Sequence, residues 1–152
     1  MNLRNFFNNK TVIVTGHTGF KGSWLSLWLK TLGAKVIGVS IDIPHKSHFQ
    51  SIKLKNKIKH IKMDIRNLKK LKKIFIKNQP DYVFHLAAQS LVKKSYLDPI
   101  YTWSTNTIGT LNILESLRFL KKKTCVAVII TSDKSYKNLE IKRGYRENDI
   151  LG

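Results

Sequence analysis

The chain has 152 residues, the size of one ordinary domain. Hydrophobic residues make up 42% of the sequence and charged residues 24%, a balance that supplies a buried core and argues against disorder. No apolar run approaches the roughly 20 residues of a membrane span, and the first residues lack the apolar centre of a secretory signal. The one cysteine, Cys125, excludes a disulfide framework and a cysteine-rich zinc site. We therefore expect a cytoplasmic domain with no bound metal and no membrane attachment.

The formal net charge of +19 at pH 7 would in principle suit a nucleic-acid partner. Most of the cations are lysines spread along the chain, however, without an arginine cluster or a known nucleic-acid-binding motif. An A+T-rich coding bias is a sufficient cause of the lysines. The alternating lysines between residues 53 and 59 indicate the solvated face of an extended segment. We expect no specific nucleic-acid partner.

Short apolar runs alternate with amphipathic segments along the chain. The runs predict strands at 11–15, 35–40, 58–63, 81–86 and 125–131. Helical spacing predicts helices at 21–32, 67–77 and 99–120, the last with one apolar face of Ile113, Leu114, Leu117 and Leu120.

Gly33 is a plausible end of the first helix, and Asn67 a plausible N-cap of the second. This order of elements predicts an α/β fold, a Rossmann-like doubly wound parallel sheet with strand order 3-2-1-4-5. The pattern stops after Thr131 in a polar tail. We therefore expect residues 1–152 to form a dinucleotide-binding domain that is incomplete at its C-terminus.

A G-x-x-G-x-x-G loop follows the first predicted strand and opens the first predicted helix. Gly16 permits the tight turn, Gly19 lets the backbone approach a pyrophosphate, and Gly22 lets the helix pack close to the sheet. The N-terminus of the helix then offers free N–H groups to an anion. The alternative is a glycine-rich turn without a ligand.

A dinucleotide site also needs an acidic side chain near the end of the second strand, to accept hydrogen bonds from a ribose. Asp42 lies 20 residues after Gly22 and suits this role, although a surface aspartate in a loop is an open alternative. A carboxylate there favours NAD, whereas Lys46 could tolerate the additional phosphate of NADP. We expect NAD as the cofactor.

Six segments together resemble the sugar-nucleotide 4,6-dehydratases of the extended short-chain dehydrogenase/reductase family. They are TGHTGFKGSWL at 15–25, MDIR at 63–66, VFHLAAQ at 83–89, NTIGT at 106–110, TSDK at 131–134 and GYRE at 144–147. The HTGFKGSW variant is most similar to the subgroup that acts on CDP-glucose. The resemblance spans essentially the whole chain, and it implies a nucleotide-sugar substrate and a homo-oligomer for the full-length enzyme.

The resemblance also implies roles for the matched positions. Asp64 and Ile65 would flank the adenine, residues 86–88 would pass under the cofactor, and Asn106 would fix the structure around the site. The expected cofactor-binding residues are Gly16, Thr18, Gly19, Phe20, Gly22, Asp42, Asp64, Ile65, Leu86, Ala87, Ala88 and Asn106. Each has a structural alternative: Asp64 could cap a turn, the alanines could pack in the core, and Asn106 could be a satisfied amide. His85 is expected to be a packed strand residue.

The resemblance further implies a reaction in which hydride leaves sugar C4, water is lost across C5 and C6, and hydride returns to C6. Ser132 would bind the C4 oxygen, and Asp133 would be the general acid, which requires a raised pKa. Many related dehydratases carry glutamate as the base where this chain has Lys134. Lys134 would then be the base itself or act electrostatically. The alternative is a solvated turn after a strand.

The tyrosine and lysine of the family, spaced Y-x-x-x-K, do not occur in the sequence. We therefore expect an N-terminal part of a lyase, without its substrate domain and inactive alone. The alternatives are another nucleotide-sugar epimerase, a GDP-mannose dehydratase, or a dinucleotide-binding module without catalysis.

Overall fold

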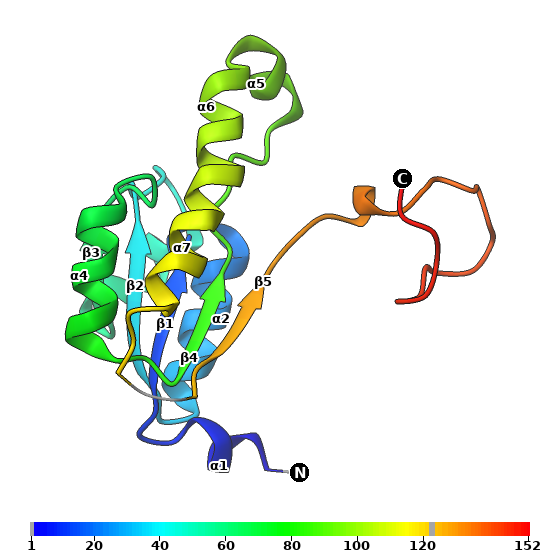
Figure 1. Ribbon diagram of the computed structural model, residues 1–152. Helices are drawn as coiled ribbons and strands as arrows, with labels where there is room; N and C mark the ends of the chain where they lie inside the picture. The colour runs from blue at the N-terminus through cyan, green and yellow to red at the C-terminus, as the bar shows by residue number, and fades with distance from the viewer. Residues whose placement is uncertain (1, 122–123) are drawn as a thin grey trace.

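The computed structural model describes residues 2–121 and 124–152, and only the backbone of Asp133. Five parallel strands form one sheet in the order β3-β2-β1-β4-β5, which confirms the predicted topology (Figure 1). Thr11 lies opposite Lys35 in the β1–β2 pair, and Val12 lies opposite Tyr82 in the β1–β4 pair. The strands are β1 (Thr11–Thr15), β2 (Lys35–Ser40), β3 (Lys59–Lys62), β4 (Tyr82–His85) and β5 (Val126–Ile129).

Helices cover both faces of the sheet. They are α1 (Leu3–Phe7), α2 (Phe20–Thr31), α3 (His48–Ser51), α4 (Leu68–Asn78), α5 (Val92–Leu97), α6 (Pro99–Trp103) and α7 (Gly109–Leu117), with a π-helical turn at Ser104–Ile108. The short α1 was not expected from the sequence. Asn67 caps α4 as predicted, because its side chain accepts a hydrogen bond from the Lys70 N–H. None of the helices in these described ranges has the length and hydropathy of a membrane span.

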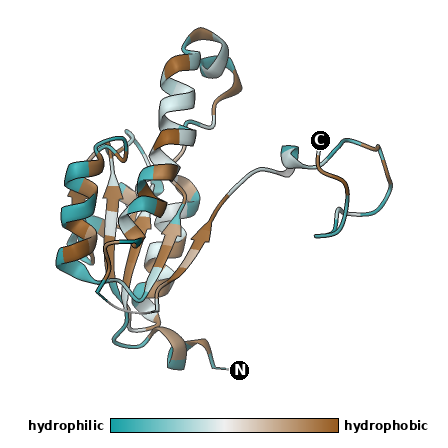
Figure 2. Ribbon diagram, in the orientation of Figure 1, coloured by the Kyte–Doolittle hydropathy of each residue, from teal (hydrophilic) through white to brown (hydrophobic). Residues whose placement is uncertain are grey.

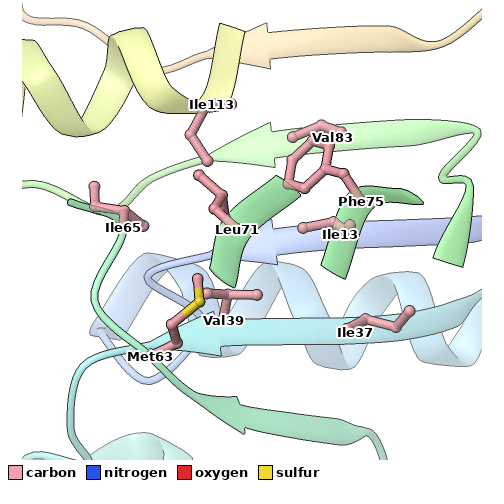
Figure 3. Close-up of a cluster of buried hydrophobic side chains, with 9 residues drawn as sticks. All are labelled: Ile13, Ile37, Val39, Met63, Ile65, Leu71, Phe75, Val83 and Ile113. Atoms are coloured by element: carbon pink, nitrogen blue, oxygen red, sulfur yellow. The ribbon is translucent and has the colours of Figure 1, made fainter. Parts of the chain in front are cut away.

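Alternate residues of β1 point into two separate cores. Ile13 packs with Leu71 and Phe75 of α4 and with Ile113 of α7 (Figure 3). Its neighbours Val12 and Val14 pack on the opposite face, in the cluster that contains Leu29 of α2. β1 is therefore hydrophobic on both sides, which is the expected pattern for a central strand of a covered parallel sheet, and Figure 2 colours much of the sheet as hydrophobic.

The predicted helix at 99–120 differs from the observed one in two respects. It is divided by the π-helical turn, and its α-helical part ends at Leu117. Leu114 was expected on the apolar face but is 45% exposed, whereas Ile113 is fully buried. Residues 113, 117 and 120 share one face of a helix, and residue 114 is rotated about 100° away from it. The expectation for Leu114 was therefore wrong.

The segment of alternating lysines is not extended. Lys53 has a φ of 50°, and a 3₁₀ turn follows at Leu54–Asn56. The turn carries Leu54 into the interior, where its side chain is fully buried. The lysines themselves are exposed, as predicted. The burial of Leu54 therefore determines the local structure, although the alternation of lysines with other residues predicts an extended segment.

The β5 edge of the sheet carries uncovered apolar side chains. Val126, Val128 and Ile130 are exposed, whereas Ala127 and Ile129 pack against the core of α4 and α7. The chain beyond β5 leads away from the sheet and closes into a loop with a bridge between Tyr136 and Leu151 (Figure 1).

Candidate functional site

A cavity of about 490 Å³ lies at the carboxyl ends of β1, β2 and β4. Parallel α/β sheets bind their ligands at this edge, where the strand order reverses. Eleven of the twelve expected cofactor-binding residues line the cavity: Gly16, Thr18, Gly19, Phe20, Gly22, Asp42, Asp64, Ile65, Leu86, Ala87 and Ala88. The structure thus brings four separate segments of the sequence to one site.

The phosphate loop fits its surroundings only without side chains at two positions. Gly16 has a φ of 71°, and a Cβ there would lie 2.8 Å from the Ala87 nitrogen. A Cβ on Gly22 would overlap the Gly16 carbonyl oxygen. Gly19 is the N-cap of α2, and no side chain that the structure describes caps the first turn. The N–H groups of this turn therefore face the cavity without a side-chain acceptor, which suits an anion.

A hydrogen bond ties the phosphate loop to the end of β2. The hydroxyl oxygens of Thr18 and Ser40 are 2.6 Å apart, and both side chains are buried. Asp42 follows two residues after Ser40, and its exposed side chain lines the cavity. Asp42 is thus a loop residue at the surface and also a wall of the site, so the two alternatives for it are not exclusive.

Asp64 is held by Arg66 at the edge of the cavity. The Asp64 Oδ2 atom is 2.6 Å from the Arg66 Nη2 atom, and Asp64 Oδ1 accepts from the Arg66 backbone N–H at 2.9 Å. The hydrogen bonds from Arg66 hold the pKa of Asp64 below its usual value. Arg66 also lies over the ring of Tyr101, 4.7 Å from its centroid. Asp64 therefore both caps a turn and lines the cavity.

His85 supports the backbone that passes under the cavity. The Thr15 hydroxyl oxygen accepts from the N–H groups of Leu86 and Ala87, each at 3.2 Å. Its own proton therefore goes to His85 Nδ1, 2.6 Å away, and His85 Nε2–H donates to the Thr110 hydroxyl at 2.9 Å. Burial lowers the pKa of His85 to about 4, which keeps the ring neutral in this arrangement. His85 is buried, as expected of a packed strand residue.

Asn106 lies in the π-helical turn and does not line the cavity. Its side chain is hydrogen bonded at both ends to the backbone of Gln89. It is thus a satisfied amide that holds the segment leaving β4, which is the structural alternative given for it, and its role at the cofactor remains a prediction.

The expected catalytic residues lie apart from this cavity. Ser132 and Lys134 are exposed, and the Lys134 backbone N–H donates to the Ser132 hydroxyl at 3.2 Å. Ile130 is the last residue of this segment that lines the cavity. The side chain of Asp133 lies outside the described part of the structure. The catalytic roles of these three residues remain a prediction.

Two features of the site were not found from the sequence. Thr105 lines the cavity, and its buried hydroxyl has no hydrogen-bond partner among the described residues. His17, within the phosphate loop, is fully buried with its Nε2 atom 2.8 Å from His60 Nδ1. Burial lowers the pKa of His17 to about 4. No pattern distinguishes Thr105 from its neighbours, and His60 approaches His17 only through the pairing of β2 with β3.

Comparisons with known proteins agree with this geometry. Residues 13–150 match the family described as GDP-mannose 4,6 dehydratase. A CDP-glucose 4,6-dehydratase of Salmonella typhimurium is 47% identical over 150 residues, which are 98% of this chain and 42% of that protein.

Two solved structures show the same fold. The epimerase Mth375 of Methanothermobacter thermautotrophicus aligns with a TM-score of 0.81 at 32% identity, over 98% of this chain and 43% of its own. A UDP-glucose 4-epimerase of Thermus thermophilus in complex with NAD aligns with a TM-score of 0.61 at 30% identity, over 71% of this chain and 33% of its own. The chain spans less than half the length of each of these relatives. Since the family match covers most of the sequence and the resemblance to sugar-nucleotide 4,6-dehydratases is confirmed, the chain belongs to the GDP-mannose 4,6-dehydratase family.

Proposed function

We propose that the chain is the NAD-binding part of a sugar-nucleotide 4,6-dehydratase that acts on CDP-glucose. The observation that carries the proposal is the convergence of the glycine loop, Asp42, Asp64 and residues 86–88 on one cavity. The choice of CDP-glucose rests on the 47% identity to the Salmonella enzyme. The proposal places the enzyme in the cytoplasm, as a homo-oligomer in its full-length form.

The residues of the cavity fit a dinucleotide. The loop from Gly16 to Gly22 leaves no room for a Cβ at either end and presents the uncapped first turn of α2, which suits a diphosphate. The hydroxyl of Thr105, for which the described part of the chain supplies no hydrogen-bond partner, offers a further donor or acceptor to a ligand. The chemistry that NAD supplies when bound is the reversible acceptance of a hydride.

Each wall of the cavity has a part in binding. The N–H groups of the loop would hold the diphosphate, and Asp42 would accept hydrogen bonds from the adenosine ribose. Asp64, which Arg66 keeps ionised, and the buried Ile65 would flank the adenine. The small side chains of Ala87 and Ala88 allow the cofactor to lie close to the backbone.

Ser132, Asp133 and Lys134 would act on the sugar. Ser132 would donate to the C4 oxygen, and Asp133 would protonate the departing C6 hydroxyl. Lys134 would remove the C5 proton or stabilise the enolate that forms. The sequence contains no Y-x-x-x-K pair to deprotonate the C4 hydroxyl, so we propose that this chain does not turn over by itself.

Titration with NAD in a calorimeter tests the binding proposal. We expect saturable binding by the chain and its loss in Gly22→Ala, where the new methyl group would meet the Gly16 carbonyl. Gly144→Ala is the matched control, because nothing lies within 4 Å of a Cβ at that position. Failure of the parent chain to bind NAD, or equal binding by the two variants, would contradict the proposal.

Mass spectrometry of CDP-glucose tests the catalytic proposal, since the product lacks one water. The chain alone is expected to form none, and robust product would overturn its inactivity. A chimera of residues 1–152 with the remaining part of the Salmonella relative is expected to form product. Asp133→Asn in the chimera should lower kcat by about 10²–10⁴-fold and leave NAD affinity unchanged. An active Asp133→Asn chimera would remove Asp133 from the mechanism.

A further inference from the structure

A second cavity, of about 550 Å³, lies at the amino ends of the strands, opposite the candidate cofactor site at their carboxyl ends. It is formed where β1, β2 and β3 begin and where α2 and α4 end. Five lysines line it: Lys30, Lys35, Lys57, Lys59 and Lys77. The other polar lining residues are Thr11, Asn56 and Asn78, and none of the lining residues is acidic.

The positive charge of this cavity is not neutralised within the described part of the chain. None of the five lysines makes an ion pair there, and the one polar side-chain contact is from Lys59 Nζ to Asn78 Oδ1 at 3.3 Å. Asp81 lies just before β4, at the same end of the sheet, but does not line the cavity. Its carboxylate accepts a hydrogen bond from the Thr11 backbone N–H at 2.8 Å.

Helix geometry accounts for only two of the five cations. Lys30 and Lys77 lie in the last turns of α2 and α4, where the helix dipole favours positive charge. Lys35, Lys57 and Lys59 come instead from the start of β2 and from the segment that enters β3. They are exposed and add like charges around the same space, so a bound anion would relieve their mutual repulsion.

We propose that this cavity binds a compact chain of phosphates, either free polyphosphate or the phosphates of a nucleoside triphosphate. Lysine ammonium groups are point-charge ligands for phosphate, and the amides of Asn56 and Asn78 add neutral donors. One phosphate group carries at most about two negative charges, so a chain of several is needed to match five lysines. The volume falls within the usual range of ligand cavities.

The lining also discriminates against nucleic acid. Its apolar part consists of aliphatic side chains, Val36, Ile37 and Ile58, and it contains no aromatic residue on which a base could stack.

Calorimetric titration of the chain with inorganic triphosphate tests the proposal. The double variant Lys57→Gln/Lys59→Gln should weaken binding by at least about tenfold, equivalent to about 1.4 kcal/mol. The matched control is Lys69→Gln/Lys73→Gln, which removes the same charge from exposed positions of α4 outside the cavity. The control should change the affinity by less than about twofold, and circular dichroism of both variants verifies the fold.

Further titrations separate the sources of the ligand and the competing sites. Tighter binding of ATP than of triphosphate would identify a nucleoside triphosphate as the ligand, and equal binding would identify free polyphosphate.

Equal weakening of triphosphate binding by the two double variants would overturn the proposal, because the net charge of the chain would then suffice. Displacement of triphosphate by NAD would also overturn it, since the anion would then lie in the cofactor cavity. A single-stranded RNA that binds more tightly than either anion, with the same dependence on Lys57 and Lys59, would replace the proposed ligand by nucleic acid.

Discussion

The side-chain amide of Asn106 forms both hydrogen bonds of the Gln89 backbone. Asn106 Oδ1 accepts from the Gln89 N–H at 2.7 Å, and Asn106 Nδ2 donates to the Gln89 carbonyl at 2.9 Å. Gln89 directly follows the three residues that pass under the cofactor cavity. One helical turn later, Thr110 accepts from His85 and donates to the Asn106 carbonyl. Asn106 and Thr110 thus hold the floor of the cavity at two points, and neither side chain lines it.

Asn106→Asp should destabilise the chain by about 1–3 kcal/mol, because the new carboxylate cannot donate to the Gln89 carbonyl and is repelled by it. Urea unfolding measures the change. Thr107→Ala is the control, since Thr107 is exposed on the same turn, and it should alter the free energy of unfolding by less than about 0.5 kcal/mol. Equal stability of Asn106→Asp and the parent chain would show that the paired amide is not a structural support.

Asp42→Asn should weaken NAD binding by about tenfold, because a charged acceptor of the ribose hydroxyls is lost. The affinity for NADP should stay the same or rise, since the carboxylate no longer repels the additional phosphate. Glu140→Gln makes the same change of net charge at an exposed position outside the cavity. If Glu140→Gln lowered NAD affinity as much as Asp42→Asn, the effect would be one of total charge and not of the ribose site.

Two tryptophans of α2 have the same exposure and different surroundings. Trp24 is 52% exposed and Trp28 is 53% exposed. The Trp24 ring stacks on His48, with centroids 4.2 Å apart, and His48 Nδ1 lies 2.8 Å from the Ser23 hydroxyl. These contacts join α3 to the first turns of α2. In the sequence, α3 lies between Asp42 and β3.

Trp24→Ala should therefore destabilise the chain by about 0.5–1.5 kcal/mol more than Trp28→Ala, which is the contribution of a stacked ring pair. It should also speed amide hydrogen exchange in residues 48–52, because α3 loses its contact with α2. Chemical unfolding and hydrogen exchange measure the two effects. Equal behaviour of the two variants would mean that the stacking does not anchor α3.

The strands and most of the lining of the candidate cavity could be predicted because both depend on local patterns. Short β-branched runs identify β1 and β2, and glycine spacing locates the phosphate loop within a predicted turn. Asp42 could be placed by its distance from Gly22. These features need no knowledge of which distant residues come into contact.

Other features depend on contacts between distant segments. Leu54 is buried inside a run that reads as a solvated strand, because tertiary packing overrides the alternation. The hydrogen bond between His17 and His60 joins residues 43 positions apart. Lys35, Lys57 and Lys77 are far apart in sequence and lie together only where strands begin and helices end. A local sequence pattern does not predict that distant residues come together in this way.

Acid should destabilise the folded chain through its buried histidines. Burial lowers the pKa values of His17 and His85 from 6.5 to about 4. Between these values the unfolded chain binds protons that the folded chain does not. The free energy of unfolding should therefore be highest above pH 6.5 and should fall as the pH decreases toward 4, by about 1.4 kcal/mol per pH unit for each histidine.

Two variants of the Thr15–His85–Thr110 contact separate this titration from a loss of packing. His85→Gln removes one titrating group, so the dependence of stability on pH should become shallower by about 1.4 kcal/mol per pH unit. Thr110→Val removes the acceptor of the His85 Nε2–H but leaves the ring buried, so it should lower stability at every pH with little change in slope. Urea unfolding between about pH 4.5 and 7 measures both slopes. If His85→Gln kept the slope of the parent chain, the acid sensitivity would have to come from other groups, because a neutral buried His85 requires the difference in proton binding that the variant removes.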